Sequence, residues 1–365
     1  MASPIRPPIA AADDHQHGRS HEAATASITT VHSDIIRSHI LTRLDGPALA
    51  AVTCASAQLS ALSSDDALWR DVCASTWPST QDPLVRQVIS TLPSSHRSFF
   101  SDSYPLLHRP KPSRQKKRPA YKFPSPTTEL ISAVDLFYKD ELVFSKVQAN
   151  ETESGWFRCS PFRVDLLGPK ELLPTFITRN SAGADDDEWL SHLEENLTMS
   201  WIVIDTALKR VVNLSSREPV SVQRHWLTGD ILVLYGTIVA GEPRKGSAAE
   251  VVQFGAVVTF GAGKSKGGVG EDCLEVTEVS LQVEDMEGRS LNGRDSLVIL
   301  EAAMEGGQRR KARKRGEAKE QFKEFEEMKR ERRRQQHRAE RALDLACIAV
   351  GVTIFVTFWS YILFR

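Results

Sequence analysis

The residues of this chain that come nearest to a catalytic motif are Gly261-Ala262-Gly263-Lys264-Ser265. In nucleotide-binding proteins a glycine-rich loop ending in Lys-Ser wraps its backbone N–H groups around phosphate. That motif also needs a glycine five residues before the one that precedes the lysine. Here this position is Val258, inside a predicted strand. The segment is therefore predicted to be a flexible hairpin loop, not a phosphate site.

No other arrangement of side chains predicts catalysis or metal binding. The 10 histidines are scattered, and the acidic run Asp185-Asp186-Asp187-Glu188 is typical of a solvated loop. The 5 cysteines lie far apart without a Cys-x-x-Cys pair, so neither a zinc ribbon nor a disulfide framework is indicated. We therefore expect a non-catalytic protein with no catalytic residue, no metal site and no cofactor.

Three tryptophans in the second half of the chain could bind a ligand by stacking. Trp156, Trp201 and Trp226 could each lie flat on a sugar ring, as in lectins, but such residues more often belong to a core. The core interpretation is favoured for all three. Trp156 and Trp226 remain the candidates for ligand binding.

Apolar residues recur at helical spacing between residues 31 and 73. Ile36, Ile40 and Leu44 follow one another every four residues, which places one stripe on a helix. Asp45-Gly46-Pro47 ends that helix, and proline suits the first turn of the next one. Apolar residues from Leu49 to Leu62 predict a second helix.

A third helix is predicted to follow the capping residues Ser63-Ser64-Asp65-Asp66 and to carry Leu68-Trp69. Three short helices have too little apolar surface to be stable alone. The pattern therefore predicts a binding partner for this segment.

The phrase from Ile40 to Leu49 and the closing Leu68-Trp69 resemble the F-box, the module by which substrate receptors dock on the Skp-type adaptor of a cullin ubiquitin ligase. Val31-His32 replace the family's usual Leu-Pro opening, and Leu59 stands where a tryptophan is common. The alternative is an ordinary helical subdomain without an adaptor. The resemblance implies adaptor-binding roles for Ile35, Ile36, Ile40, Leu41, Leu44, Pro47, Leu49, Leu68 and Trp69.

The resemblance extends to plant F-box proteins that have a β-rich C-terminal region. It is carried there by the phrase from Gly155 to Asp165 and by the phrase from Ser221 to Leu227. It implies a receptor that holds an unknown protein substrate, with a cullin recruited through the adaptor.

Composition sets further bounds. The chain has 365 residues and a formal net charge of −1, so no overall field directs it to nucleic acid. Residues 1–28 are rich in Pro, Ala, Asp and His without an apolar segment, which predicts disorder and no secretory signal. The isolated cysteines favour a reducing compartment.

Domain boundaries follow from changes in pattern. The F-box is expected at 29–75 and a helical extension at 76–107. Residues 108–126 form a basic, proline-rich linker, for which a nuclear localisation signal is the alternative. The period changes to two over 127–305, with a hairpin across Lys139-Asp140, roughly eight strands and a closing helix from Asp295 to Met304. This region is the predicted antiparallel β-sandwich.

The last signal is an uncharged run at 345–364. A helix of this length spans about 30 Å, the thickness of the hydrocarbon layer. The preceding 306–344 are rich in Lys and Arg and predict a charged helical stalk, which holds its flank in the cytosol. The alternatives are a buried soluble helix for 345–364 and a nucleic-acid-binding helix for the stalk.

The sequence thus predicts an α+β multidomain protein with an F-box, a β-sandwich-like domain, a stalk and a single transmembrane helix. We expect a substrate receptor that is tail-anchored in a membrane, the endoplasmic reticulum first, with residues 1–344 cytosolic and the lipid bilayer as a partner. The alternative location is the cytosol or nucleus. The alternative function is a tail-anchored lectin-like or scaffold protein without a ubiquitin-ligase role.

Overall fold

The computed structural model describes residues 31–107, 127–180, 185–241, 251–263, 271–306, 309–310 and 316–364. The segments predicted to be a disordered start (1–28) and a basic linker (108–126) lie outside the described residues. The chain divides into two compact units, Met1–Ser63 and Ser64–Arg365.

The first unit is helical. Residues 33–43 form one helical run that changes from α to π to 3₁₀ geometry, and Asp45 caps the next helix by accepting a hydrogen bond from the backbone N–H of Ala48 at 2.8 Å. The predicted single helix from Leu49 to Leu62 is wrong, because Ser56 accepts a hydrogen bond from the N–H of Leu59 and starts a new helix there. The elements are α1 (Ser33–Ile35), η2 (Ile36–Ile40), η3 (Leu41–Arg43), α2 (Gly46–Thr53) and α3 (Ala57–Ser63).

The second unit begins with the helix that carries Leu68-Trp69. Asp65 caps this helix by accepting a hydrogen bond from the N–H of Ala67 at 3.0 Å, as its sequence predicted. The sequence grouped this helix with the preceding ones, but its packing assigns it to the second unit, because Trp69 lies against Phe100. The helical elements are α4 (Asp66–Thr76), η4 (Pro78–Gln81), α5 (Pro83–Ile89) and α6 (Ser95–Ser103).

A four-stranded antiparallel sheet has the order β3-β2-β6-β7. The predicted hairpin joins β2 to β3, and Lys139 and Asp140 both adopt left-handed backbone, with φ of 51° and 62°. Two consecutive residues of this kind are typical of the tight turn that matches strand twist. The strands are β2 (Glu129–Tyr138), β3 (Glu141–Glu151), β6 (Leu197–Asp205) and β7 (Arg210–Asn213).

A six-stranded antiparallel sheet has the order β4-β11-β10-β9-β8, and β5 pairs with the other end of β11. Its long strands β10 and β11 carry the alternating apolar residues from which strands were predicted. The strands are β4 (Arg163–Asp165), β5 (Leu173–Asn180), β8 (Ser221–Arg224), β9 (Ile231–Ala240), β10 (Val251–Gly263) and β11 (Glu271–Asp285). A two-stranded pair joins β1 (Leu106–Leu107) to β12 (Arg309–Arg310).

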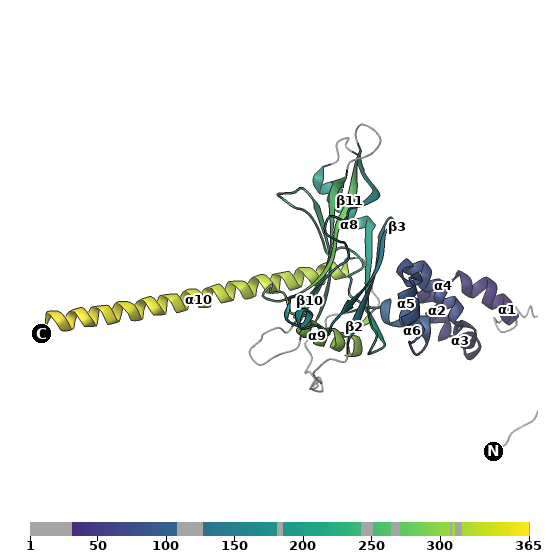
Figure 1. Cartoon of the computed structure of the whole chain (residues 1–365), viewed down its shortest axis with the longest axis horizontal. Helices are drawn as coiled ribbons and strands as arrows, with labels where there is room; N and C mark the ends of the chain where they lie inside the picture. Colours follow the sequence, from purple (N-terminus) through teal and green to yellow (C-terminus); the bar gives the residue numbers. More distant parts are fainter. Residues whose placement is uncertain are drawn as a thin grey trace, which may run out of the picture. The chain divides into compact units, whose positions relative to one another are not determined.

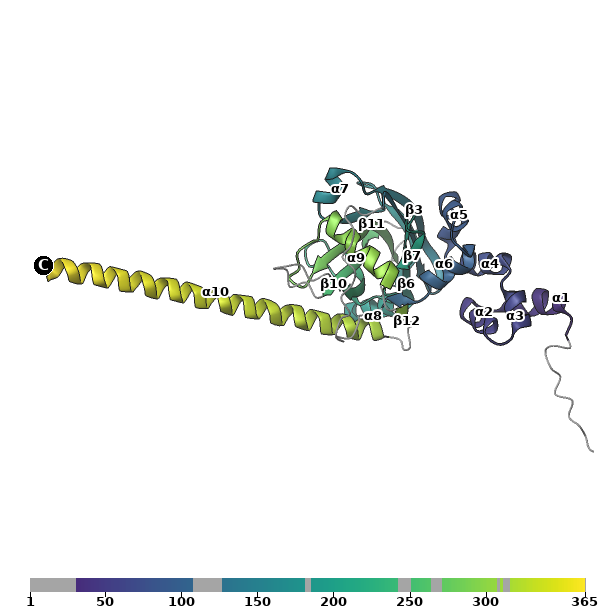
Figure 2. The same ribbon diagram turned by 90° about the horizontal axis from the view of Figure 1, so that it is seen from below.

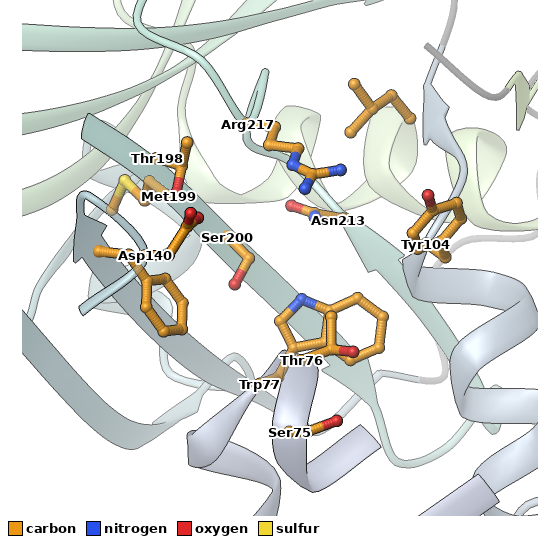
Figure 3. Close-up of a pocket in the computed structure, with 12 residues that line it drawn as sticks. Ser75, Thr76, Trp77, Tyr104, Asp140, Thr198, Met199, Ser200, Asn213 and Arg217 are labelled. Carbon is orange, nitrogen blue, oxygen red and sulfur yellow. The ribbon is translucent and has the colours of Figure 1, made fainter. Parts of the chain in front are cut away.

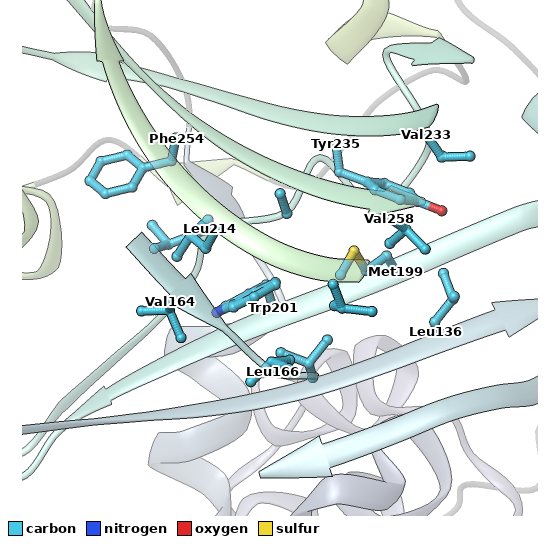
Figure 4. Close-up of a cluster of buried hydrophobic side chains, with 14 of the residues drawn as sticks. Leu136, Val164, Leu166, Met199, Trp201, Leu214, Val233, Tyr235, Phe254 and Val258 are labelled. Atoms are coloured by element: carbon cyan, nitrogen blue, oxygen red, sulfur yellow. The ribbon is translucent and has the colours of Figure 1, made fainter. Parts of the chain in front are cut away.

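One hydrophobic core receives side chains from both large sheets. Figure 4 shows Met199 and Trp201 of β6 facing Tyr235 of β9 and Val258 of β10, and all four are buried. The fold is therefore α+β with two antiparallel sheets, as predicted.

Three helices accompany the sheets. The acidic run that was predicted to be a loop instead starts a helix, with Asp185 at its N-cap, and carboxylates in a first helical turn interact favourably with the helix dipole. The helix over 295–304 was predicted correctly, and the backbone N–H of Gly293 at its start donates to the carbonyl of Ser160 beside α7 (Figure 2). These helices are α7 (Gly155–Cys159), α8 (Asp186–Asn196) and α9 (Gly293–Gly306).

The C-terminal helix α10 (Glu317–Leu363) is continuous from Glu317 through the rest of the predicted stalk and into the apolar run, as the yellow ribbon shows (Figure 1). The prediction of a helix is wrong near the start of the stalk, where Arg309 and Arg310 form the strand β12. The expectation of a wholly solvated stalk is wrong for its first turns. Phe325 is completely buried against Ile238, Val251 and Met286, and the ammonium group of Lys329 lies 3.2 Å from Glu284. The first part of α10 is therefore docked on the six-stranded sheet.

Candidate functional site

The predicted adaptor-binding residues of the first unit divide by exposure. Ile35 and Ile40 are 50% and 37% exposed, which is unusual for isoleucine on a short helix. Leu44 and Pro47 are partly buried. The remaining members of the predicted set are buried: Ile36, Leu41 and Leu49.

The π-helical turn explains why the predicted stripe does not stay on one face. The backbone N–H of Leu41 bonds to the carbonyl of Ile36, five residues back. A turn of this kind brings residues five apart to the same side, and Ile36 and Leu41 are both buried. Ile40, which a regular α-helix would place below Ile36, turns outward. Ile35 and Ile40, also five apart, are thus the exposed apolar side chains of this run.

The other two predicted adaptor-binding residues lie in the second unit. Leu68 and Trp69 are 6% and 2% exposed, and the Trp69 ring lies 5.3 Å from that of Phe100 on α6. Their surroundings are those of a core, so each stabilises the contact between α4 and α6. An adaptor could reach these side chains only after local rearrangement.

Electrostatics also fix α4 against α6. The Asp66 carboxylate lies 2.9 Å from Nδ1 of His96, whose backbone N–H donates to the same carboxylate at 3.1 Å. Burial, and then the charge of Asp66, raise the pKa of the Cys73 thiol to about 12. Cys73 is therefore a neutral core residue and no nucleophile.

The two candidate ligand-binding tryptophans are exposed, so the prediction of core positions is wrong for them. Trp156 on α7 is 83% exposed, and Trp226 in the β8–β9 turn is 87% exposed. Trp226 stacks on His225, with ring centroids 6.3 Å apart. Trp201 is completely buried, as predicted. Trp226 is exposed because it lies in a turn, where no neighbouring strand among the described residues covers it.

The β8–β9 turn that carries Trp226 is tied to α8 by charge. Asp186 accepts hydrogen bonds from the Arg224 guanidinium at 2.6 and 2.7 Å, and its pKa is lowered chiefly by that contact. Arg179 of β5 also lies 2.9 Å from the Asp186 carboxylate. In the sequence, Asp186 belongs only to a predicted solvated loop, and nothing there indicates its contact with Arg224.

Among the described residues, α10 is the one helix long and apolar enough to cross a membrane. Its apolar side chains are exposed to solvent throughout the final run, for example Ile348 at 61% and Phe355 at 63%. Within the described ranges no group of three or more His, Cys, Asp or Glu side chains is placed to hold a metal ion.

Comparison with known proteins gives relatives over nearly the whole chain. No family model matches the sequence, and no solved structure matches it. The chain is 44% identical over 345 residues to F-box protein At2g27310 of Arabidopsis thaliana, which covers 93% of this chain and 97% of that protein.

Two further Arabidopsis thaliana proteins are similarly related. F-box protein At3g44326 is 46% identical over 296 residues, covering 80% of this chain and 77% of that protein. Probable F-box protein At2g36090 is 43% identical over 341 residues, covering 93% and 95%. These similarities extend far beyond the helices that suggested the resemblance. The chain belongs to a plant F-box protein family.

Proposed function

We propose that this protein is a substrate-receptor subunit of an SCF-type ubiquitin ligase, in which a Skp-type adaptor joins the F-box protein to a cullin. The family membership carries the proposal. The exposed Ile35 and Ile40 support it, because apolar side chains at the surface of a helix are the usual anchors for a partner's groove. The receptor itself performs no chemistry.

The rate effect in this proposal comes from proximity. The helices of the first unit bind the adaptor, and the β domain binds a target protein. Holding the target's lysines near a recruited ubiquitin-conjugating enzyme raises their effective concentration, so chemistry on another subunit becomes faster. The contribution of this chain is therefore two binding surfaces on one polypeptide.

Adaptor binding is tested by co-precipitation of the full chain with a Skp-type adaptor. The change Ile35→Asp with Ile40→Asp places charge on the exposed pair, and we expect adaptor recovery to fall at least about tenfold. Leu142→Asp on β3 is the matched control, because Leu142 is 40% exposed. Equal recovery by the double variant and by wild type contradicts the proposal.

We also propose that α10 anchors the receptor in a membrane as a tail anchor, with the endoplasmic reticulum as the first candidate. The exposed apolar run after Asp344 supports this, and Arg338 and Arg341 immediately before it would face anionic headgroups on the cytosolic side.

The anchor is tested by carbonate extraction of membranes. The full chain should remain in the pellet, and a chain ending at Asp344 should move to the supernatant. Replacing residues 345–364 with an unrelated membrane-spanning helix should restore the pellet fraction. Recovery of the full chain in the supernatant rules the anchor out.

The exposed tryptophans support a second candidate function, a lectin-like binding protein. Trp156 and Trp226 offer aromatic faces at 83% and 87% exposure, suited to stacking on a sugar ring. A glycan array that binds wild type but neither Trp156→Ala nor Trp226→Ala, together with no adaptor recovery, favours this function over the ligase receptor.

A further inference from the structure

A cavity of about 250 Å³ lies within the second unit, between the helical segment and the four-stranded sheet. The end of α4 and Trp77 form one wall, and residues of β6 and the segment that follows β7 form the other (Figure 3). None of the predicted adaptor-binding residues lines it. The cavity is therefore separate from the surface proposed to dock the adaptor.

Ser200 on β6 is among the residues that line this cavity, and its buried hydroxyl is unsatisfied. The side chain is 93% buried, since its exposed fraction is 7%, and its Oγ has no hydrogen-bond partner among the described residues. Figure 3 shows the hydroxyl pointing from β6 toward Trp77. A buried polar group without a partner costs about 1–3 kcal/mol, so a ligand atom that bonds to it binds with that advantage.

Asn213 adds a donor whose orientation is fixed. Its Oδ1 accepts hydrogen bonds from the backbone N–H groups of Trp201 at 3.3 Å and Ser215 at 3.0 Å. Because both partners are donors, the atom they contact must be the amide oxygen, and the amide nitrogen remains available to donate. That nitrogen has no protein acceptor within the described part of the chain.

Arg217 supplies a cation that no described carboxylate neutralises. Its backbone is left-handed, with φ of 67°, an uncommon conformation for arginine that is often retained at functional sites. Two hydrogen bonds hold it there: its N–H donates to Ser215 Oγ at 3.0 Å, and its carbonyl accepts from the N–H of Met199 at 2.9 Å. These bonds tie the backbone of Arg217 to β6, and its exposed side chain carries the guanidinium at the edge of the cavity (Figure 3).

The rest of the wall is largely apolar and pre-formed. Trp77 is 4% exposed and packs against Phe99 and Phe100, with ring centroids 5.8 and 5.5 Å away. Phe137 extends this surface. Asp140, in the β2–β3 turn, is the carboxylate among the lining residues, and Figure 3 shows it on the other side of Ser200 from Arg217.

We propose that this cavity binds a small organic carboxylate with a short apolar body. The guanidinium fork of Arg217 suits the two oxygens of a carboxylate, and Asn213 and Ser200 complete its hydrogen bonds. Trp77 and Phe137 cover the apolar part of the ligand. The volume of about 250 Å³ admits a single ring or a short chain and excludes a folded peptide.

The test uses the full chain in lipid nanodiscs and isothermal titration with 3-phenylpropionate and octanoate. The neutral amide of each acid is the matched ligand control. We expect saturable binding of at least one acid and binding of its amide at least about tenfold weaker. Empty nanodiscs correct for partition into lipid. No saturable binding of either acid up to about 10 mM, or equal binding of acid and amide, overturns the proposal.

Variants locate the binding. Arg217→Gln should weaken the acid at least about tenfold, and Arg86→Gln, an exposed arginine on α5, should leave it unchanged. Ser200→Ala should weaken the acid several-fold while leaving the thermal midpoint equal or higher, because it removes an unpaired buried hydroxyl. Acid binding that survives both Arg217→Gln and Ser200→Ala overturns the proposal.

Discussion

Asp135 on β2 accepts two hydrogen bonds from Ser79 on η4, one from the backbone N–H at 2.9 Å and one from the hydroxyl at 2.5 Å. The carboxylate is completely buried and also accepts from the Ser145 hydroxyl at 2.7 Å. Burial raises the pKa of Asp135, and the three hydrogen bonds oppose that rise. This pair joins the helical segment to the four-stranded sheet and thereby fixes both walls of the cavity.

Removing the Ser79 hydroxyl should therefore destabilise the second unit. We expect Ser79→Ala to lower the free energy of unfolding by about 1.5–3 kcal/mol, because it withdraws a charge-assisted hydrogen bond from a buried carboxylate. Denaturant unfolding followed by tryptophan fluorescence measures this. Ser101→Ala, at an exposed position on α6, should change the value by less than about 0.5 kcal/mol. Equal values for the two variants contradict the role given to Ser79.

Glu301 predicts a pH dependence of stability. The side chain is 7% exposed, and burial, followed by the charge of Asp205, raises its pKa from 4.5 to about 7. Folding then favours the protonated form, so the stabilisation is complete below about pH 4.5 and is lost as the pH rises through about 7.

Glu301→Gln removes that loss. We expect the variant to exceed wild type in free energy of unfolding by about 1–2 kcal/mol at pH 8 and to match it at pH 4. Thermal unfolding at the two pH values compares them. Glu151→Gln, at an exposed position, should follow wild type at both. A Glu301→Gln variant that is less stable than wild type at pH 8 refutes the assignment.

Cys73 should resist alkylation in the native protein. Its thiol is completely buried with a pKa of about 12, whereas Cys54 and Cys159 are exposed. With N-ethylmaleimide at neutral pH, we expect Cys73 to react on the order of a hundredfold more slowly than Cys159 and to react fully after denaturation. Peptide mass spectrometry follows each site. Modification of native Cys73 as fast as Cys159 would mean that α4 is not packed on α6.

Phe325 should hold the start of α10 on the sheet. We expect Phe325→Ala to remove about 3 kcal/mol of local stability, which is more than a hundredfold faster amide exchange in the first turns of α10. Hydrogen–deuterium exchange of the full chain measures this, with Glu324→Ala at an exposed neighbouring position as the control. Unchanged protection in Phe325→Ala shows that the docking does not depend on this ring.

Local patterns were enough to predict several of the regular elements. The Lys139-Asp140 turn separates two runs of period two, so the hairpin followed from neighbouring residues alone. The helix over 295–304 and the cap at Asp65 were accessible for the same reason. The sequence also contains a signal for α8 that the prediction of a loop overlooked. Trp189 and Leu193 are four residues apart, a spacing typical of an amphipathic helix, and both are buried.

The remaining features depend on contacts between distant parts of the chain. The exposure of Trp226 could not be predicted from its neighbours in the sequence, because it depends on whether another strand covers the turn. The cavity brings Trp77 together with Ser200 and Arg217, which are more than 100 residues away along the chain. The π-helical turn at Ile36–Ile40 could not be predicted from the apolar spacing, because the same spacing is typical of a regular α-helix.

The continuity of α10 has a geometric consequence for a receptor anchored in a membrane. Lys329 is bonded to Glu284 on the sheet, and the apolar run starts at residue 345. At about 1.5 Å per residue, the helix between them is about 24 Å long and has no break at which to bend. The β domain would therefore be held at a nearly constant distance from the lipid surface. Target proteins whose binding sites lie closer to the bilayer, or much farther from it, would not be within reach of the β domain.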